Sequence, residues 1–206
     1  MNRRQATMAA SREAIVEAAG AQFARFGYEA TSFSRVAEAM GRPRSAVGYH
    51  LFPSKLSLAS AVITTEQAHW ADLASASTDP AGVERLTRVL LTTALETRTR
   101  PGTAGAVRLL RELLHTDVAV PRGFVWADFV RAQLQAAPRS TALPLPEHAE
   151  DLVLEATFGL TTAARPSSDD ELVRRLHALW VPLLVSFGID DAADRVAPAP
   201  LVLAQS

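Results

Sequence analysis

The acidic and histidine side chains of this sequence offer three spacings that could support chemistry. Glu112 and His115 have the Glu-x-x-His spacing of a ligand pair in a di-iron helical bundle. His69 with Asp72, and His115 with Asp117, are spaced as acid–base pairs. A di-iron site needs two such ligand pairs and further carboxylates, and neither acid–base pair has a nucleophile nearby in the sequence. We therefore predict surface or capping roles for these residues, with no catalytic residue and no metal site.

Longer catalytic and cofactor-binding motifs are also missing from the sequence. It contains no Gly-x-Ser-x-Gly elbow, no P-loop, no dinucleotide fingerprint and no His-Glu-x-x-His motif. It contains no cysteine, which excludes disulfides, thiolate chemistry and cysteine-ligated zinc. We expect a protein that is not an enzyme and that binds no cofactor.

The residues between 31 and 55 predict two short helices joined by a tight turn. Thr31 or Ser32 can cap the first helix. Its apolar face follows at i, i+3, i+4 and i+7, formed by Phe33, Val36, Ala37 and Met40. Gly41 tolerates the left-handed conformation that ends a helix. Pro43 suits the first turn of a second helix, which we expect to run to about Leu51.

A longer helix is predicted upstream, from Ser11 to Gly27, and another begins after Pro53 with Ser54 as its cap. Residues 11–55 then have the layout of a helix-turn-helix DNA reader. Its second short helix presents an outward set of side chains: Arg44, Ser45, Gly48, Tyr49 and His50. Two alternatives stay open, because this geometry also occurs in proteins that never touch DNA, and Tyr49 and His50 could be half-buried packing residues.

The charge of the chain is divided between its two ends. Residues 1–55 contain eight basic and four acidic side chains, whereas the remainder contains 13 basic and 18 acidic ones. A basic head on an acidic body favours binding to phosphate through one end only. A solvated basic face is the alternative.

Four segments of this region resemble the N-terminal domain of TetR-type transcriptional regulators: residues 26–32, 36–41, 49–50 and 52–55. The sequence departs from the family pattern at Gly48, where an aromatic residue is usual, and at Leu51-Phe52, which is one residue longer. The resemblance implies an all-α fold, with a helix-turn-helix DNA-binding domain over residues 1–55 and a helical ligand-binding and dimerisation domain over residues 56–206. The DNA-binding residues expected from the motif and the basic head are Arg3, Arg4, Thr31, Ser32, Arg42, Arg44, Ser45, Tyr49, His50 and Lys55.

Downstream of Lys55 the apolar spacing is helical, and helix-breaking residues separate the segments. The predicted helices cover residues 56–76, 83–99, 104–115, 124–137, 147–164 and 169–187. Pro182 predicts a kink or an early end of the last helix. The Ala- and Pro-rich tail after Gly188 is predicted to be only partly ordered.

The last two predicted helices carry more apolar surface than one small domain needs. We expect them to form a four-helix bundle across a two-fold dimer. A two-fold dimer would place two recognition helices one DNA turn (~34–36 Å) apart on a near-palindromic site. The alternative is that these faces are internal core. The expected dimer contacts are Leu152, Ala156, Gly159, Leu172, Leu176, Leu179, Trp180 and Leu183.

Shorter segments resemble the gamma-butyrolactone receptor branch of the TetR family: residues 120–126, 171–180, and 61–62 with Trp70. In that branch a tryptophan matching Trp126 lines the ligand pocket. The resemblance therefore implies a small apolar effector such as a gamma-butyrolactone, a butenolide or a furan. Without the resemblance, Trp126 is better interpreted as a core residue. The expected ligand-binding residues are Trp126, Phe129, Val130, Leu90, Leu110, Thr157 and Thr161.

Together these patterns predict a homodimeric repressor that binds a double-stranded DNA operator and is released by a small hydrophobic effector. An effector from an unrelated efflux or catabolic system is the first alternative. A helical enzyme or interaction module without a DNA role is the second. The sequence shows no signal peptide and no apolar run long enough to cross a membrane, so we expect a cytoplasmic protein.

Overall fold

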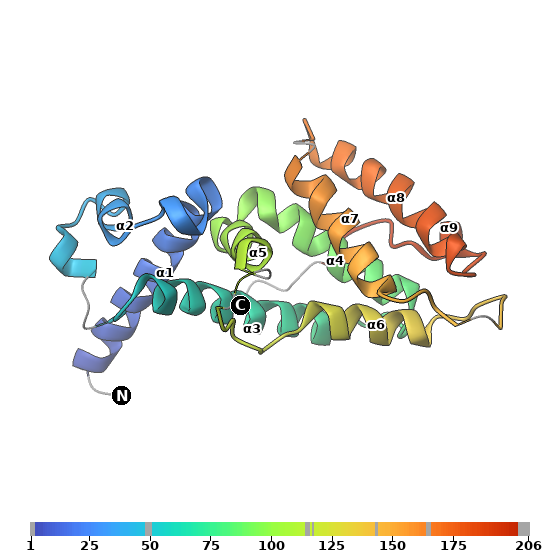
Figure 1. The fold of residues 1–206 in the computed structure, drawn as a ribbon, viewed down its shortest axis with the longest axis horizontal. Coiled ribbons are helices and arrows are strands. Elements are labelled where there is room, and N and C mark those ends of the chain that lie inside the picture. The colour runs from blue at the N-terminus through green and yellow to red at the C-terminus, as the bar shows by residue number, and fades with distance from the viewer. Residues whose placement is uncertain are drawn as a thin grey trace. The chain divides into compact units, whose positions relative to one another are not determined.

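The chain folds into α-helices, as the apolar spacing predicts (Figure 1). The computed structural model describes residues 3–47, 51–113, 116, 118–142, 144–163 and 166–201. Within these ranges there is no β-strand. The helices are α1 (Arg3–Ala30), α2 (Phe33–Ala39), the short 3₁₀ helix η1 (Arg44–Val47), α3 (Lys55–Ala76), α4 (Val83–Thr99), α5 (Pro101–Leu113), α6 (Trp126–Ala136), α7 (Ala149–Ala163), α8 (Asp169–Ser186) and α9 (Ala192–Arg195).

Two compact units make up the chain. The first combines residues 1–68 with residues 97–123, and the second combines residues 69–96 with residues 124–206. No helix in the described part of the chain is both long and apolar enough to cross a membrane.

The most extensive helix pair of the first unit is α1 with α5 (Figure 1). Three glycines make this close packing possible. A Cβ atom on Gly20 would lie 2.9 Å from the Gly102 Cα, and a Cβ atom on Gly105 would collide with the Gly20 carbonyl group. The core side of α1 is formed by the apolar residues that the 3.6-residue period selects: Ile15, Val16, Ala19 and Phe23.

Helix α1 is longer than the predicted 11–27 segment at both ends. It begins at Arg3, and it resumes after a break at Gly27, whose φ of 77° and ψ of −178° are not helical. The helix was predicted to end at Gly27; the structure has a break there, and the chain continues as helix to Ala30.

The turn chemistry of the helix-turn-helix follows the sequence closely. Ser32 caps α2 by accepting a hydrogen bond from the Arg35 N–H at 3.3 Å, and Gly41 adopts a φ of 62°. Ser54 caps α3 by accepting a hydrogen bond from the Ser57 N–H at 3.0 Å. The predicted helix over residues 43–51 appears as the 3₁₀ helix η1, and residues 48–50 lie outside the described part of the chain.

In the second unit, α7 packs against both α6 and α8, and α9 packs against α8 (Figure 1). Helix α8 continues past Pro182 to Ser186, so the early end that a proline predicts is not found. In the first unit, α5 begins three residues earlier than predicted. Pro101 occupies its first position, where the missing N–H costs no hydrogen bond.

The structure describes residues 189–201 of the tail that was predicted to be only partly ordered. The backbone of this tail is held by side chains of α4: the Ala197 N–H donates to Thr87 Oγ1 at 2.9 Å and the Leu201 N–H donates to Thr92 Oγ1 at 2.8 Å. Arg88 donates to the Ala199 carbonyl oxygen at 2.9 Å. These bonds satisfy backbone groups that Ala- and Pro-rich composition alone would leave to water.

Candidate functional site

The predicted DNA-binding residues around the turn after α2 are solvent-exposed. Arg42, Arg44 and Ser45 are exposed there, and Ser32 is exposed at the cap of α2. Arg3 is exposed at the start of α1. The backbone of Arg4 is helical, whereas its side chain, together with Tyr49 and His50, lies outside what the structure describes.

Thr31 is buried, unlike the other hydroxyl residue predicted beside it. Its Oγ1 donates a hydrogen bond to the Gly27 carbonyl oxygen at 2.7 Å and lies 3.2 Å from the Gln22 carbonyl oxygen, which can share the same proton. The side chain therefore closes the connection between α1 and α2. A direct DNA contact of Thr31 remains a prediction.

Lys55, the first residue of α3, reaches the C-terminal end of α1. Its Nζ donates to the carbonyl oxygens of Tyr28 at 2.9 Å and Glu29 at 3.1 Å, and it lies 4.3 Å from the centre of the Tyr28 ring. The Lys55 side chain keeps 29% of its surface exposed. The expected contact of Lys55 with the DNA backbone stays a prediction.

Three arginines of the head lie over phenylalanine rings, which sequence spacing did not reveal. The Arg35 guanidinium lies 4.5 Å and that of Arg25 5.0 Å from the centre of the Phe26 ring, and Arg12 lies 5.1 Å from the centre of the Phe52 ring. Stacking on a ring restricts the orientation of a guanidinium group. Arg12, Arg25 and Arg35 are not among the residues predicted to bind DNA.

An aromatic cluster occupies the core of the second unit around Trp126. Its ring lies 5.0 Å from Phe124, 5.3 Å from Trp70, 5.6 Å from Phe158 and 6.1 Å from Phe129, measured between ring centres. Trp126 is only 8% exposed, and Trp70 is fully buried. The predicted residues Trp126 and Phe129 thus lie together, and the structure adds Trp70, Phe124 and Phe158 to them.

Two indole N–H groups in this cluster have no hydrogen-bond acceptor among the described residues. They are Nε1 of Trp70 and Nε1 of Trp126, and the buried Thr93 Oγ1 of the same unit is also unpaired. By contrast, Trp180 Nε1 donates to Thr157 Oγ1 at 2.8 Å. Buried donors are nearly always paired in proteins, with other protein groups, with ordered water or with a ligand, so water or a ligand would have to supply the acceptors for these two indoles.

The remaining predicted ligand residues do not all lie in the same unit. Leu90 and Val130 are fully buried in the second unit. The Thr157 and Thr161 hydroxyls donate to backbone carbonyl oxygens one turn earlier in α7, at 2.6 and 2.8 Å. Leu110 belongs to α5 in the first unit, where it is half-buried.

The predicted dimer residues fall into two groups. Leu172, Leu176 and Trp180 are buried within the subunit, which is the core alternative that the sequence left open. Leu152 of α7 is 47% exposed, and Ala156, Gly159, Leu179 and Leu183 are half-buried. On α8 the exposed apolar residues are Ala178, Pro182 and Val185, of which only Val185 is large.

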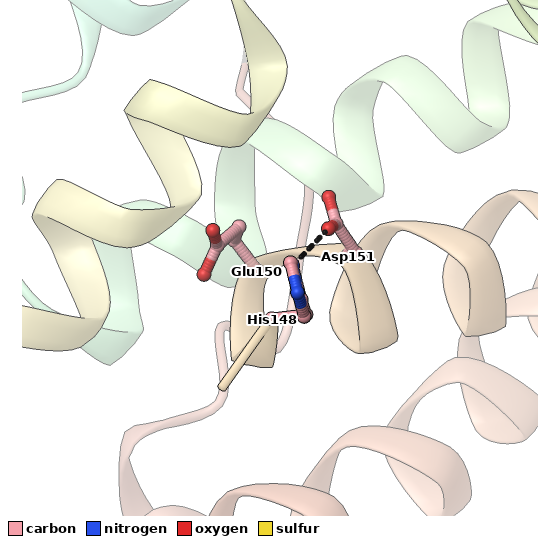
Figure 2. Close-up of side chains that lie close together, drawn as sticks. All are labelled: His148, Glu150 and Asp151. Atoms are coloured by element: carbon pink, nitrogen blue, oxygen red, sulfur yellow. Dashed lines mark hydrogen bonds and ion pairs between the residues drawn. The ribbon is translucent and has the colours of Figure 1, made fainter. Parts of the chain in front are cut away.

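His148, Glu150 and Asp151 at the start of α7 are the one group of potential metal ligands found among the described residues. Figure 2 shows the Glu150 carboxylate directed away from the His148–Asp151 pair, which is joined at 3.2 Å. Glu150 instead accepts hydrogen bonds from Arg131, one of them from Nε at 3.1 Å, and these bonds lower the pKa of Glu150. Because Arg131 already neutralises the buried carboxylate, the group is a poor cation site.

The head of this chain is similar in sequence to a known DNA-binding domain. Residues 15–62 match the family model described as bacterial regulatory proteins, tetR family. The head of this chain belongs to the TetR family. The protein that carries it is a DNA-binding regulator and not an enzyme.

Solved structures of TetR-family proteins have the same fold over most of the chain. One, titled as the molecular basis for control of antibiotic production by a bacterial hormone, is 28% identical, has a TM-score of 0.66, and is matched over 85% of this chain and 96% of its own. CprB from S. coelicolor A3(2) is 23% identical with a TM-score of 0.71, over 90% and 94% of the two chains. An ArpA-like gamma-butyrolactone receptor is 22% identical with a TM-score of 0.68, over 90% and 92%. No curated protein sequence matches the chain.

The Glu-x-x-His spacing also occurs at a second place in the chain, Glu66 and His69, which the prediction missed. In the TetR fold these residues have other partners. Glu66 accepts a hydrogen bond from Thr103 Oγ1 at 2.7 Å, and His69 Nε2 lies 2.8 Å from Glu96 Oε2. His69 thus pairs with a glutamate of α4. His115 and Asp117 lie outside the described residues.

Proposed function

We propose that this TetR-family regulator is a homodimeric, ligand-responsive repressor that acts in the cytoplasm on a near-palindromic operator. The observation that carries the proposal is the exposed group Arg42, Arg44 and Ser45 in a head that matches the TetR DNA-binding domain. In this arrangement Arg44, Ser45, Tyr49 and His50 contact bases or phosphate in the major groove. Arg3, Arg4, Arg42, Ser32 and Lys55 fix the register on the backbone, and Thr31 supports them.

The effector site is proposed in the aromatic cluster of Trp70, Trp126, Phe129 and Phe158. Two buried indole donors favour a ligand that is apolar and that carries an oxygen acceptor, such as a gamma-butyrolactone, a butenolide or a furan. Likeness to gamma-butyrolactone receptors agrees with this class. Ligand binding must favour the released form by the same factor by which it weakens DNA binding.

Homodimerisation is proposed through the exposed parts of α7 and α8. Leu152 and Val185 are two of the few large apolar side chains that remain exposed among the described residues. Gly159 has open space where a Cβ atom would lie, which permits the close approach of another helix. A two-fold dimer also explains how one small head could bind a palindromic operator tightly.

The proposal is tested by fluorescence anisotropy of the full chain on DNA from upstream of its own gene. Affinity is measured over a range of salt concentrations, against a random duplex, and then with extract of the producing culture added. Tight, salt-sensitive binding that an extract component releases is the expected result. Binding no tighter than to the random duplex would count against this promoter as the target. Specific binding that no extract component releases would count against the effector.

A further inference from the structure

Helix α1 is interrupted at Gly27, whose φ of 77° and ψ of −178° lie in a region that essentially only glycine adopts. In a continuous helix the Tyr28 N–H would donate to the Ala24 carbonyl oxygen, four residues earlier. At this break the Tyr28 N–H and the Ala24 carbonyl oxygen both bond to other groups.

Two side chains of α5 take the places of these missing partners. The Tyr28 N–H donates to Glu112 Oε2 at 2.6 Å, and Arg108 Nη1 donates to the Ala24 carbonyl oxygen at 3.0 Å. Arg108 Nε also donates to Glu112 Oε1 at 2.7 Å. The Arg108–Glu112 ion pair is thus inserted into the hydrogen-bond ladder of α1, with one partner on each side of the opening.

The surrounding residues permit this insertion. A Cβ atom on Gly27 would lie 2.5 Å from Glu112 Oε1 and 2.7 Å from Arg108 Nη2, so only glycine leaves room for the pair. Gly105 lies on the same face of α5 as Arg108 and Glu112, and its contact with Gly20 fixes α5 along α1. An exposed ion pair on one helix contributes little by itself, but here both partners also bond to the backbone of a second helix.

The segment beyond the break leads directly into the DNA reader. Thr31 Oγ1 donates to the Gly27 carbonyl oxygen at 2.7 Å, and Ser32 caps α2. Lys55 donates to the Tyr28 carbonyl oxygen at 2.9 Å. The Tyr28 peptide groups are therefore held by Glu112 of α5 on one side and by Lys55 of α3 on the other. The direction in which α1 resumes after Gly27 sets where α2 begins.

We propose that Arg108 and Glu112 are positioning residues for DNA recognition, which hold the break in α1 open and so fix the reader relative to the rest of α1. This inference rests on the proposed operator binding. Neither residue touches DNA in the proposal. They act through the Tyr28 and Ala24 backbone groups, so their loss lowers specific affinity and leaves phosphate contacts in place.

The test compares Glu112→Ala, Glu112→Gln and Glu29→Gln in the full-length protein. Glu112→Gln keeps an acceptor for the Tyr28 N–H. Glu29→Gln is the matched control, because it removes the same charge one residue from Tyr28 on a side chain that is 93% exposed. Each variant is measured on an operator that binds the wild type and on a random duplex, with circular dichroism to verify folding. Hydrogen exchange of the Tyr28 amide is followed by NMR.

Glu112→Ala is expected to lose about tenfold in operator affinity, the scale of one hydrogen bond to a charged group, with unchanged affinity for the random duplex. The Tyr28 amide of Glu112→Ala is expected to exchange faster. Glu112→Gln is expected to retain most of the operator affinity and most of the protection of the Tyr28 amide, and Glu29→Gln is expected to retain both in full. Wild-type operator affinity in a folded Glu112→Ala variant would overturn the positioning role while leaving the proposed function intact. A wild type without any preferred DNA site would refute both together. An unchanged rate of hydrogen exchange at the Tyr28 amide in Glu112→Ala would also overturn the positioning role.

Discussion

The Lys55 ammonium group lies 4.3 Å from the centre of the Tyr28 ring and donates a 2.9 Å hydrogen bond to the Tyr28 carbonyl oxygen. A second hydrogen bond, of 3.1 Å, goes to the Glu29 carbonyl oxygen. The first residue of α3 thereby satisfies carbonyl groups at the end of α1, where no intrahelical donor is available. One lysine links the two helices that flank the reader.

Lys55→Met is expected to lower the free energy of unfolding by about 1–2 kcal/mol, because it removes the charged donor to both carbonyl oxygens. Thermal unfolding measures this loss, with Lys55→Arg as the conservative control. If Lys55 also contacts phosphate, the slope of log affinity for DNA against log salt concentration is about one unit smaller in Lys55→Met than in the wild type. An unfolding temperature equal to that of the wild type would contradict the linking role.

Arg44→Ala is expected to weaken operator binding about tenfold or more without unfolding the protein, since Arg44 is exposed at the start of η1. Anisotropy on the operator measures the loss. Arg122→Ala, at an exposed arginine of the segment before α6, is the matched control and should bind normally. Equal affinities for the two variants would remove Arg44 from the reader.

Trp126→Phe is expected to retain operator binding and to require about tenfold more effector for release, because it keeps an aromatic ring but removes the unpaired N–H. A synthetic alkyl gamma-butyrolactone serves as the probe in the release assay. Trp180→Phe is the control, since the Trp180 N–H already has Thr157 as its acceptor. Normal release of Trp126→Phe by a probe that releases the wild type would refute the role of this indole.

Leu152→Arg and Val185→Arg are expected to convert the dimer into monomers, because each places a charge on an apolar face that the proposed dimer buries. Analytical ultracentrifugation at micromolar concentration reports the state. Met8→Arg, at a side chain that is equally exposed but lies on α1, should leave the dimer unchanged. A monomeric wild type would show that these faces do not associate.

Asp79 gives a stability contribution that depends on pH. Hydrogen bonds from Arg88, of 2.5 and 3.1 Å, lower the pKa of Asp79 below its unfolded value of about 3.9. The contribution is therefore complete above that unfolded value and is lost as pH falls through the lower, folded pKa. Asp79→Asn should unfold at a lower temperature than the wild type at pH 7, and the difference should shrink towards pH 3. Asp72→Asn, at an exposed aspartate, is the control for the loss of one negative charge.

Local signals in the sequence predicted most helices and caps. Helix α4 was predicted with both of its bounds, Val83 and Thr99, because Thr78-Asp79-Pro80 and Arg100-Pro101-Gly102 mark its ends. The caps at Ser32 and Ser54 were predicted for the same local reason. These features depend on residues within one turn of the helix end.

Features that depend on distant residues were not predictable. The continuation of α1 past Gly27 involves Glu112, which is 84 residues away along the chain. The placement of Ala197 and Leu201 beside α4 depends on hydrogen bonds to Thr87 and Thr92. Apolar spacing also could not decide whether Leu176 and Trp180 face α7 of the same subunit or a partner. The structure places both in the core of the subunit.

The most direct test of the proposed function is selection of binding sites by the full-length protein from a pool of random DNA duplexes. The dimeric repressor predicts enrichment of one near-palindromic sequence, with half-sites one helical turn (~34–36 Å) or a multiple of it apart. Arg44→Ala should reduce that enrichment. A pool that shows no preferred sequence after repeated selection would contradict the proposed operator-binding function.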